Sequence, residues 1–211
     1  MSDYEDKIWL DGNRKLDAIC QDVLDARADI SNALVLAHFK STLAIVEGRL
    51  RARSIEYKSY LPLDFSSLCF RGHDTESTSV WVGLASYFQA RSLALAEQSG
   101  SSLRILVAEH HPMASRDQAV PDAARSLSCN AQVIHHTSLT DPLLNHFAGD
   151  RIRGLMKQLG MEEQECISHP VINRAIRNAQ EKIQSQIQRE MQTSSPEEWF
   201  RYNLPPSTPS F

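Results

Sequence analysis

The stretch ALVLAHFKSTLAIVEGRL, from Ala33 to Leu50, decides the fold of this chain. Its first five residues are continuously apolar, which is typical of a strand buried on both faces of a sheet. A helical pattern follows at once over residues 41–53. Upstream, residues 13–27 carry apolar side chains at the spacing of an amphipathic helix. The order helix, buried strand, helix is how a parallel α/β domain begins.

Outward from this stretch, the same alternation of strands and helices continues through the first two thirds of the chain. Residues 55–60 and 67–70 are weak strand candidates, separated by turn-forming residues. The stronger patterns are strands at residues 80–84, 103–108 and 131–135 and helices at residues 85–97 and 116–127. We therefore expect an α/β fold with about five parallel strands and helices on both faces.

The last third of the chain is different, because it contains helical patterns only. The longest spans residues 171–191 and places Ile172, Ile176 and Ile183 on one face. The final residues, LPPSTPSF, are rich in proline and cannot continue a helix. An all-helical extension with a partly disordered tail is the expected end of the protein.

Composition limits the function classes. The chain has 211 residues and a formal charge of -4, so it has no overall basic surface and nucleic acid is not an expected partner. Its four cysteines lack CxxC spacing and are expected to be reduced thiols. No stretch approaches the about 20 apolar residues of a membrane-spanning helix, and the N-terminus lacks an export signal. We expect a cytoplasmic protein.

Residues for self-contained ATP hydrolysis are missing. A P-loop needs GxxxxGK[ST], because its backbone N–H groups and lysine surround the phosphates. None of the eight glycines is placed to form this motif. The chain also lacks the acidic pair at a strand end that would hold magnesium.

Two pairs of histidines lie at the ends of predicted strands, where α/β proteins often place ligands. His110-His111 and His135-His136 could form a zinc site together with Cys129 or Glu109. However, neighbouring residues on a strand point to opposite faces, so neither pair can chelate one metal ion. We therefore expect no metal site.

A hydrolase triad is a further interpretation that the sequence invites, on Ser138, His136 and Asp141. The chain has no GxSxG motif to expose the nucleophile. We therefore predict no catalytic residue of this kind.

From Thr137 the sequence reads TSLTDPLLNHFAGDRIRGLMKQLGMEEQECISHPVINRAIRNAQEKI. It closely resembles the segment of the SecA protein-export ATPases that leaves the second nucleotide-binding fold and starts the long scaffold helix. The family pattern is a serine-leucine-acid-aspartate run, then FG-x-[DE]-R-[IV], then LGM, then E-x-I-x-[HS]-x-x-V-x-[RK]-A-I-x-x-AQ-x-K. The residues that fit are Ser138, Leu139, Asp141, Phe147, Asp150, Arg151, Ile152, Leu159, Gly160, Met161, Glu165, Ile167, His169, Val171, Arg174, Ala175, Ile176, Ala179, Gln180 and Lys182.

A weaker likeness continues upstream in the same order. Residues 11–18 are similar to the helix that begins the second lobe of SecA, and residues 33–50 to its following strand and helix. Residues 103–117 stand where the family has a strand followed by TERHESRRID. The likeness covers most of residues 11–183, and its specific part is the last stretch, residues 137–183.

The departures from the family concern the groups that handle nucleotide. A glycine-arginine-glycine-threonine-aspartate motif becomes SYFQARSLAL here, and QLRGRAGRQGD becomes QAVPDAARSLSCN. Glycines that let the backbone approach phosphate are lost, and Arg125 is the one finger arginine with a counterpart. The resemblance implies no catalytic residue and, as nucleotide-facing residues if that role is retained, Glu109, His111, Asp117 and Arg125.

The resemblance also implies the domain organisation. Residues 1–141 would be a degenerate RecA-like lobe, of the second-lobe type of P-loop NTPases and helicases. Residues 142–192 would be a helical extension like the start of the SecA scaffold, and residues 193–211 a tail. The residues expected to pack the scaffold or a partner are Phe147, Arg151, Met161, Ile172, Ile176 and Ile183.

The implied function is that of a non-catalytic lobe or accessory module in protein translocation. Loss of an arginine finger alone costs about 10³ to 10⁵ in rate, and this sequence also lacks the family's first lobe. The implied partner is a separate SecA-like first lobe or the export machinery, with ATP and Mg²⁺ bound only when a partner lobe is present. Membrane association would be peripheral, at the inner membrane.

Two alternatives remain open. In the first, the chain is half of a composite ATPase, with Arg125, Glu109 and His111 facing nucleotide held by the other lobe. In the second, it is the remnant of a split gene without activity of its own.

Overall fold

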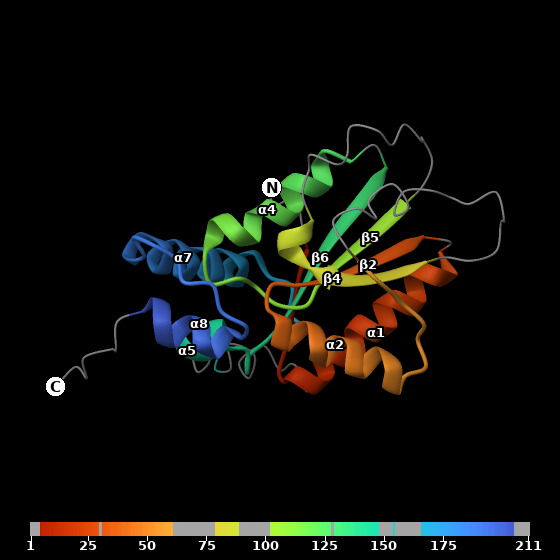
Figure 1. Cartoon of the computed structure of the whole chain (residues 1–211), viewed down its shortest axis with the longest axis horizontal. Helices are drawn as coiled ribbons and strands as arrows, with labels where there is room; N and C mark the ends of the chain where they lie inside the picture. The colour runs from red at the N-terminus through yellow and green to blue at the C-terminus, as the bar shows by residue number, and fades with distance from the viewer. Residues whose placement is uncertain are drawn as a thin grey trace.

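The computed structural model describes residues 5–29, 31–60, 79–88, 102–127, 129–147, 154 and 166–204 (Figure 1). Within these residues, one sheet of six parallel strands runs in the order β1-β6-β5-β2-β4-β3. The strands are β1 (Glu5–Trp9), β2 (Asn32–Ala37), β3 (Lys58–Ser59), β4 (Val80–Leu84), β5 (Ser102–Val107) and β6 (Asn130–Ser138). None of the described helices is long and apolar enough to cross a membrane.

The strands expected from continuous apolar runs are confirmed. β2 lies in the interior of the sheet, between β4 and β5, and Leu34, Val35 and Leu36 have no exposed surface. β6 continues beyond the predicted residues 131–135 to Ser138. The weak candidate at residues 55–60 is reduced to the two residues of β3, and residues 67–70 lie outside the described residues.

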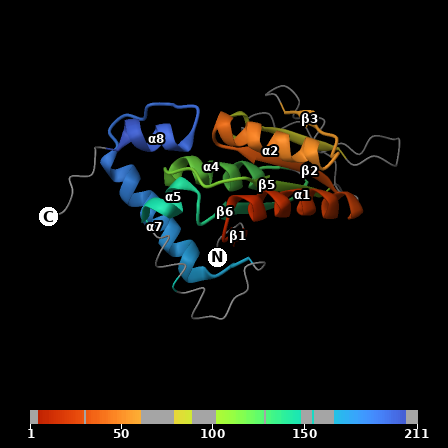
Figure 2. The ribbon, with the colours of Figure 1, turned by 90° about the horizontal axis from the view of Figure 1, so that it is seen from below.

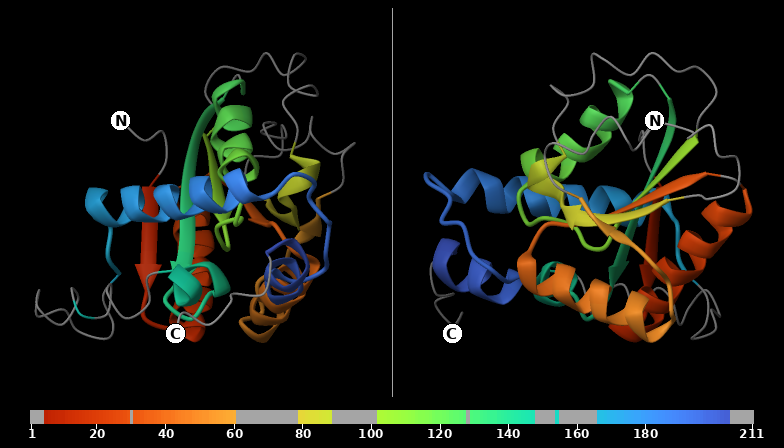
Figure 3. Two further views of the ribbon diagram at one scale, coloured as in Figure 1. Left: turned by 90° about the vertical axis from the view of Figure 1, so that its left-hand side faces the viewer. Right: turned by 45° about the vertical axis from the view of Figure 1, so that its right-hand side comes forward.

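Helices cover both faces of the sheet, as expected. α1 (Gly12–Ala28) and α2 (Lys40–Ala52) pack on one face, and α4 (Ala114–Arg125) packs on the other, as Figure 3 shows. Each face has its own core of buried apolar side chains. Of the helix predicted at residues 85–97, the structure describes one 3₁₀ turn, η1 (Ala85–Tyr87), and residues 89–101 lie outside the described residues.

The N-terminal strand β1 was not predicted. It pairs in parallel with β6 at the edge of the sheet, where Asp6 stands opposite His135. Asp6 and Ile8 point inward and are buried, while Glu5 is exposed. The alternation of a half-buried strand is hard to recognise in β1, because Asp6 faces inward as well as the apolar Ile8.

The connections between strands leave the middle of the sheet in opposite directions. From β2 the chain passes through α2 to β3 on one side, whereas from β5 it passes through α4 to β6 on the other. Because β2 and β5 are neighbours, a topological switch point lies between them. All strands are parallel, so their carboxyl ends meet at one edge, called here the carboxyl edge.

The helical C-terminal extension packs against this edge and against β1. It consists of α5 (Pro142–Phe147), α7 (Pro170–Gln186) and α8 (Pro196–Asn203). Ile172, Ile176 and Ile183 are buried in its core, as the apolar stripe predicts. α7 ends at Gln186 rather than at residue 191, because the backbone of Ile187 is extended and the chain turns back toward α2 (Figure 2).

Helix α8 lies in the stretch that the sequence analysis assigned to the tail. Ser195 caps it, since its hydroxyl oxygen accepts a hydrogen bond from the N–H of Glu198 at 3.2 Å. Pro196 occupies the first turn, where a missing N–H costs nothing. The run Ser-Pro-Glu-Glu is a capping-box signature that could have predicted this helix. Residues 205–211 lie outside the described residues.

Replacing Trp199 of α8 by alanine should lower the free energy of unfolding by about 3–5 kcal/mol, because the indole is only 1% exposed. Urea denaturation monitored by circular dichroism measures this loss. Tyr202→Ala on the same helix is the control, since Tyr202 is 53% exposed and should change stability by about 0.5 kcal/mol or less. Equal effects of the two substitutions would mean that α8 does not contribute to the core.

Candidate functional site

The carboxyl edge holds a cluster of buried polar side chains, which we call the edge cluster. They come from β1, from the segments after β2 and β5, from α4 and from β6. Most are less than 6% exposed, although polar side chains are normally found at the surface. Its members are Asp6, His38, Glu109, His110, His111, Asp117 and His135.

Asp117 lies at the centre of the edge cluster. Its Oδ2 is 2.6 Å from Nδ1 of His110 and accepts a hydrogen bond from Nε2 of Gln180 at 2.9 Å. Its Oδ1 accepts a hydrogen bond from the backbone N–H of His111 at 3.0 Å. Burial raises the pKa of Asp117, but the imidazoles of His110 and His135 outweigh it and hold the pKa well below its usual range. The carboxylate is therefore ionised although it is buried.

His110 lies between two carboxylates. Its Nε2 is 3.2 Å from Oδ1 of Asp6, on the side opposite to Asp117. Burial lowers the pKa of His110, but Asp117 and Asp6 raise it well above the usual value. The ring stacks on His135 with centroids 4.8 Å apart, and burial lowers the pKa of His135 to about 4. The two stacked histidines thus differ in charge at neutral pH.

Glu109 caps the helix α2 from another element. Its Oε1 accepts hydrogen bonds from the N–H groups of His38 and Phe39, both at 3.1 Å, and its Oε2 accepts one from the Thr42 hydroxyl at 2.7 Å. Burial raises the pKa of Glu109. A helix N-terminus is a common binding site for phosphate. Here a carboxylate of the protein itself occupies that position.

A cleft of about 390 Å³ lies at the switch point, next to the edge cluster. Phe39, Phe88 and Trp199 supply its apolar walls, and Arg116 lies at its side. Residues 187–195, which join α7 to α8 and are called here the strap, close it. The backbone N–H of Ser41, in the first turn of α2, donates to the carbonyl of Ser194 in the strap at 3.0 Å.

Glu190 of the strap lines the cleft as an anion. Its Oε2 accepts two hydrogen bonds from Arg116, at 2.8 and 3.1 Å, and its Oε1 accepts one from Nε1 of Trp199 at 3.0 Å. His111 Nε2 is 3.4 Å from the same Oε1. The contact with His111 and the hydrogen bonds from Trp199 and Arg116 lower the pKa of Glu190 to about 2. The strap therefore places its own carboxylate on the wall of the cleft, beside Arg116.

The structure brings together three of the four residues expected to face nucleotide. Glu109, His111 and Asp117 belong to the edge cluster, where they bind groups of the same chain. Arg125 is not with them: it lies eight residues after Asp117 on α4, about 12 Å along the helix axis, and pairs with Asp122 at the surface.

The other predicted site residues have different positions. Ile172, Ile176 and Ile183 pack in the core of the extension, Phe147 ends α5, and Arg151 and Met161 lie outside the described residues. Ser138, His136 and Asp141 do not come together in one group. Asp141 accepts hydrogen bonds from Ser138 Oγ at 2.7 Å and from Lys15, whereas His136 contacts Trp9 and lies 3.0 Å from Asp22.

His135 and His136 follow the expected alternation on β6, since His135 faces the edge cluster and His136 faces α1. The expectation fails for His110 and His111, because β5 ends at Val107 and both residues contact Asp117. A site that combines one histidine from each pair was not predicted. His110 and His135 meet at Asp117, and the ligand atoms of these three residues all lie within 4.8 Å of one another. Cys129 is not a member, because it packs against the core under α4. These three residues could therefore hold a metal ion between them.

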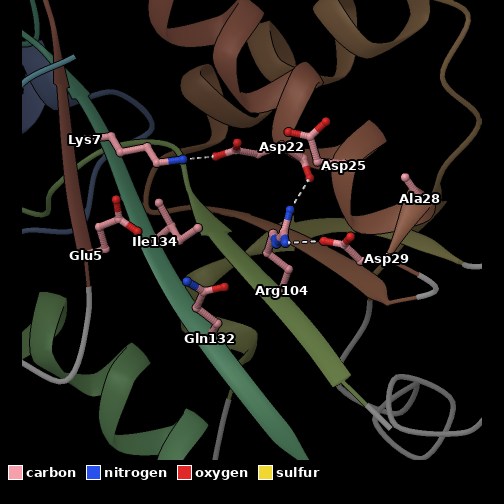
Figure 4. A pocket seen from close by; sticks show the side chains of 9 residues that line it. All are labelled: Glu5, Lys7, Asp22, Asp25, Ala28, Asp29, Arg104, Gln132 and Ile134. Atoms are coloured by element: carbon pink, nitrogen blue, oxygen red, sulfur yellow. Dashed lines mark hydrogen bonds and ion pairs between the residues drawn. The ribbon is translucent and has the colours of Figure 1, made fainter. Parts of the chain in front are cut away.

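A second, open cavity of about 450 Å³ lies on the other side of the molecule, between β1, β6, β5 and α1 (Figure 4). Its charged groups pair with one another. Lys7 Nζ is 2.8 Å from Asp22 Oδ2, and Arg104 Nη2 is 2.9 Å from Asp29 Oδ2. Both cations of this polar groove are thus paired, and Glu5 and Asp25 give its lining an excess of acidic side chains.

Fold and site together define the protein as an α/β lobe, built on a six-stranded parallel sheet with helices on both faces, that carries a helical C-terminal extension. No protein-family model matches the chain. Among solved structures, it is similar to one described as the C-terminal part of the Fun30 ATPase domain, at 14% sequence identity and a TM-score of 0.42. The similarity covers 81% of this chain and 54% of that one, so the chain spans about half of the structure that it matches.

Replacing Asp117 by asparagine should destabilise the fold by about 3–5 kcal/mol, because it removes one partner of a buried ion pair and leaves His110 with Asp6 as its remaining carboxylate partner. Chemical denaturation measures the loss. Asp122→Asn on the same helix is the control, because Asp122 pairs with Arg125 at the surface and such pairs contribute about 0.2–1 kcal/mol. A loss for Asp117→Asn no greater than that of the control would contradict the central role of Asp117.

Glu190→Gln should change the acid stability of the protein. The folded pKa of about 2 lies below the ordinary value of 4.5, so the carboxylate stabilises the fold above pH 4.5 and this contribution disappears as the pH falls toward 2. The variant should be less stable than the wild type at pH 6, and the difference should shrink between pH 4.5 and pH 2. Urea denaturation over this range tests it, with Glu181→Gln, at an exposed position, as control. A difference that does not depend on pH would contradict the contacts of Glu190.

Proposed function

We propose that the chain is a non-catalytic RecA-like lobe that acts as an accessory module of a protein-translocating motor of the SecA type. In this role it works in the cytoplasm and depends on a partner lobe for any ATP hydrolysis. The observation that carries the proposal is the state of the carboxyl edge: the groups that a nucleotide-handling lobe would present to phosphate bind groups of the same chain instead.

Three contacts support this proposal. Glu109 occupies the N-terminus of α2, where phosphate would otherwise find N–H donors. Asp117 is fully engaged by His110, Gln180 and a backbone N–H. Glu190 holds Arg116 in the cleft. A phosphate group would have to displace these carboxylates of the protein before it could bind their donors.

The helical extension supports the assignment to the SecA type. Gln180, which belongs to the stretch that resembles the start of the scaffold helix, donates hydrogen bonds to the backbone carbonyl of His111 at 2.8 Å and to Asp117. The residues that carry the resemblance therefore fix the extension to the lobe. This contact between the extension and the lobe is what an accessory module with retained packing requires.

The isolated chain should neither bind a fluorescent ATP analogue saturably in the presence of Mg²⁺ nor hydrolyse ATP, because its phosphate donors are occupied. Equilibrium titration and a phosphate-release assay measure this. Affinity capture of the tagged chain from a lysate of its own organism, followed by mass spectrometry and an ATPase assay, should recover a protein with a P-loop.

Each outcome separates the proposal from its alternatives. ATP turnover that appears only with the captured partner and is lost in Arg125→Ala would replace the accessory module by a composite ATPase. Turnover that survives Arg125→Ala fits the accessory module. Saturable ATP binding by the chain alone, or capture of no protein with a P-loop, would overturn the proposal.

A further inference from the structure

Buried polar atoms that lack a hydrogen-bond partner gather in the edge cluster. Oδ1 of Asp6, Nε2 of His38 and Nε2 of His110 are buried and make no hydrogen bond within the described residues. Native proteins pair more than about 90% of such groups, and one that remains calls for an explanation such as water or an ion. Nε2 of His38 faces Oδ1 of Asp117 at 3.2 Å, whereas Oδ1 of Asp6 and Nε2 of His110 face each other at 3.2 Å on the side of His110 opposite to Asp117.

Two of the distances around Asp117 are compatible with ligands of one ion. His38 Nε2 is 3.2 Å and His135 Nε2 is 3.7 Å from the same oxygen, Oδ1 of Asp117. In a tetrahedral zinc site with bonds of about 2.0–2.1 Å, neighbouring ligand atoms lie about 3.3 Å apart. The two observed distances lie on either side of this value.

His110 is the member that must move. Its Nδ1 is 2.6 Å from Oδ2 of Asp117, which is a hydrogen-bond distance. To bind the same ion, these two atoms would have to move about 0.7 Å further apart. The ring can make this change because it is held by stacking on His135 rather than by a covalent constraint.

We propose that His110, Asp117 and His135, with His38 as fourth ligand, form a structural site for a divalent transition metal, preferably zinc. Imidazole nitrogens with one carboxylate are a ligand set typical of zinc, whereas calcium and magnesium require oxygen ligands. Asp6, 3.2 Å from the other nitrogen of His110, and Gln180, bonded to Asp117, would orient the ligands from outside.

The burial of the site assigns it a structural role. His135 has no exposed surface and Asp117 is 4% exposed, so four protein ligands would enclose the ion and leave no position for substrate. The ion would join the segments after β2 and β5 to α4 and β6, that is, both sides of the switch point. This inference does not depend on the proposed function.

The test is metal titration of the full chain after removal of any tag and treatment with a chelator. Calorimetry with Zn²⁺ should show one equivalent bound, and Co²⁺ should give the visible absorption bands of a tetrahedral site. His135→Gln should weaken Zn²⁺ binding by about 10–100-fold or more. His136→Gln is the matched control, because His136 is the next residue on β6, is equally buried and faces Asp22 on the other side of the sheet. Its affinity for Zn²⁺ should equal that of the wild type.

The proposal is overturned if the wild type binds less than one equivalent of Zn²⁺ or if the two glutamine variants lose affinity equally. Circular dichroism shows whether His135→Gln folds. If it does not, His38→Gln takes its place in the same comparison, and the tetrahedral Co²⁺ spectrum of the wild type decides the question independently.

Discussion

A carboxylate is tolerated in a protein interior only where hydrogen bonds and opposite charges replace its hydration, and Asp117 shows how this chain meets that condition. Its partners come from the segment after β5, through His110 and His111, and from α7, through Gln180. One buried charge therefore fixes the first turn of α4, the carboxyl edge of the sheet and the helical extension relative to one another. The lobe and its extension are joined by this polar contact as well as by apolar packing.

The central part of the fold could be predicted because burial on both faces leaves a simple mark in the sequence. Val35 and its neighbours in β2 are apolar without interruption, and the same holds for β4. β1 could not be recognised in this way, since Asp6 points into the protein and is buried with an ionisable partner that lies far away in the sequence. Helix α8 could have been predicted, because the sequence carries a helix-capping signal at Ser195.

Much less of the site could be predicted. The alternation of side chains along a strand correctly separated His135 from His136, but the meeting of His135 with His110 depends on the pairing of β5 with β6, which no local pattern reveals. The resemblance to SecA grouped Arg125 with Asp117, although the helix that carries both places them far apart. The position of Glu190 on the wall of the cleft depends on the chain turning back after α7, where an apolar stripe predicts only more helix.

The position of β1 has a consequence for the order in which the molecule is assembled. β1 precedes the other strands in the described sheet, yet its neighbour in the sheet is β6, the last of them. The register of β1 is therefore set only when residues such as Trp9 and Ser138 pair. Contacts between residues so distant in sequence slow folding, because a long loop has to close before they form. Until then the outer edge of β6 presents unpaired backbone groups that can recruit strands of other chains. β1 thus covers this edge only after β6 has been made.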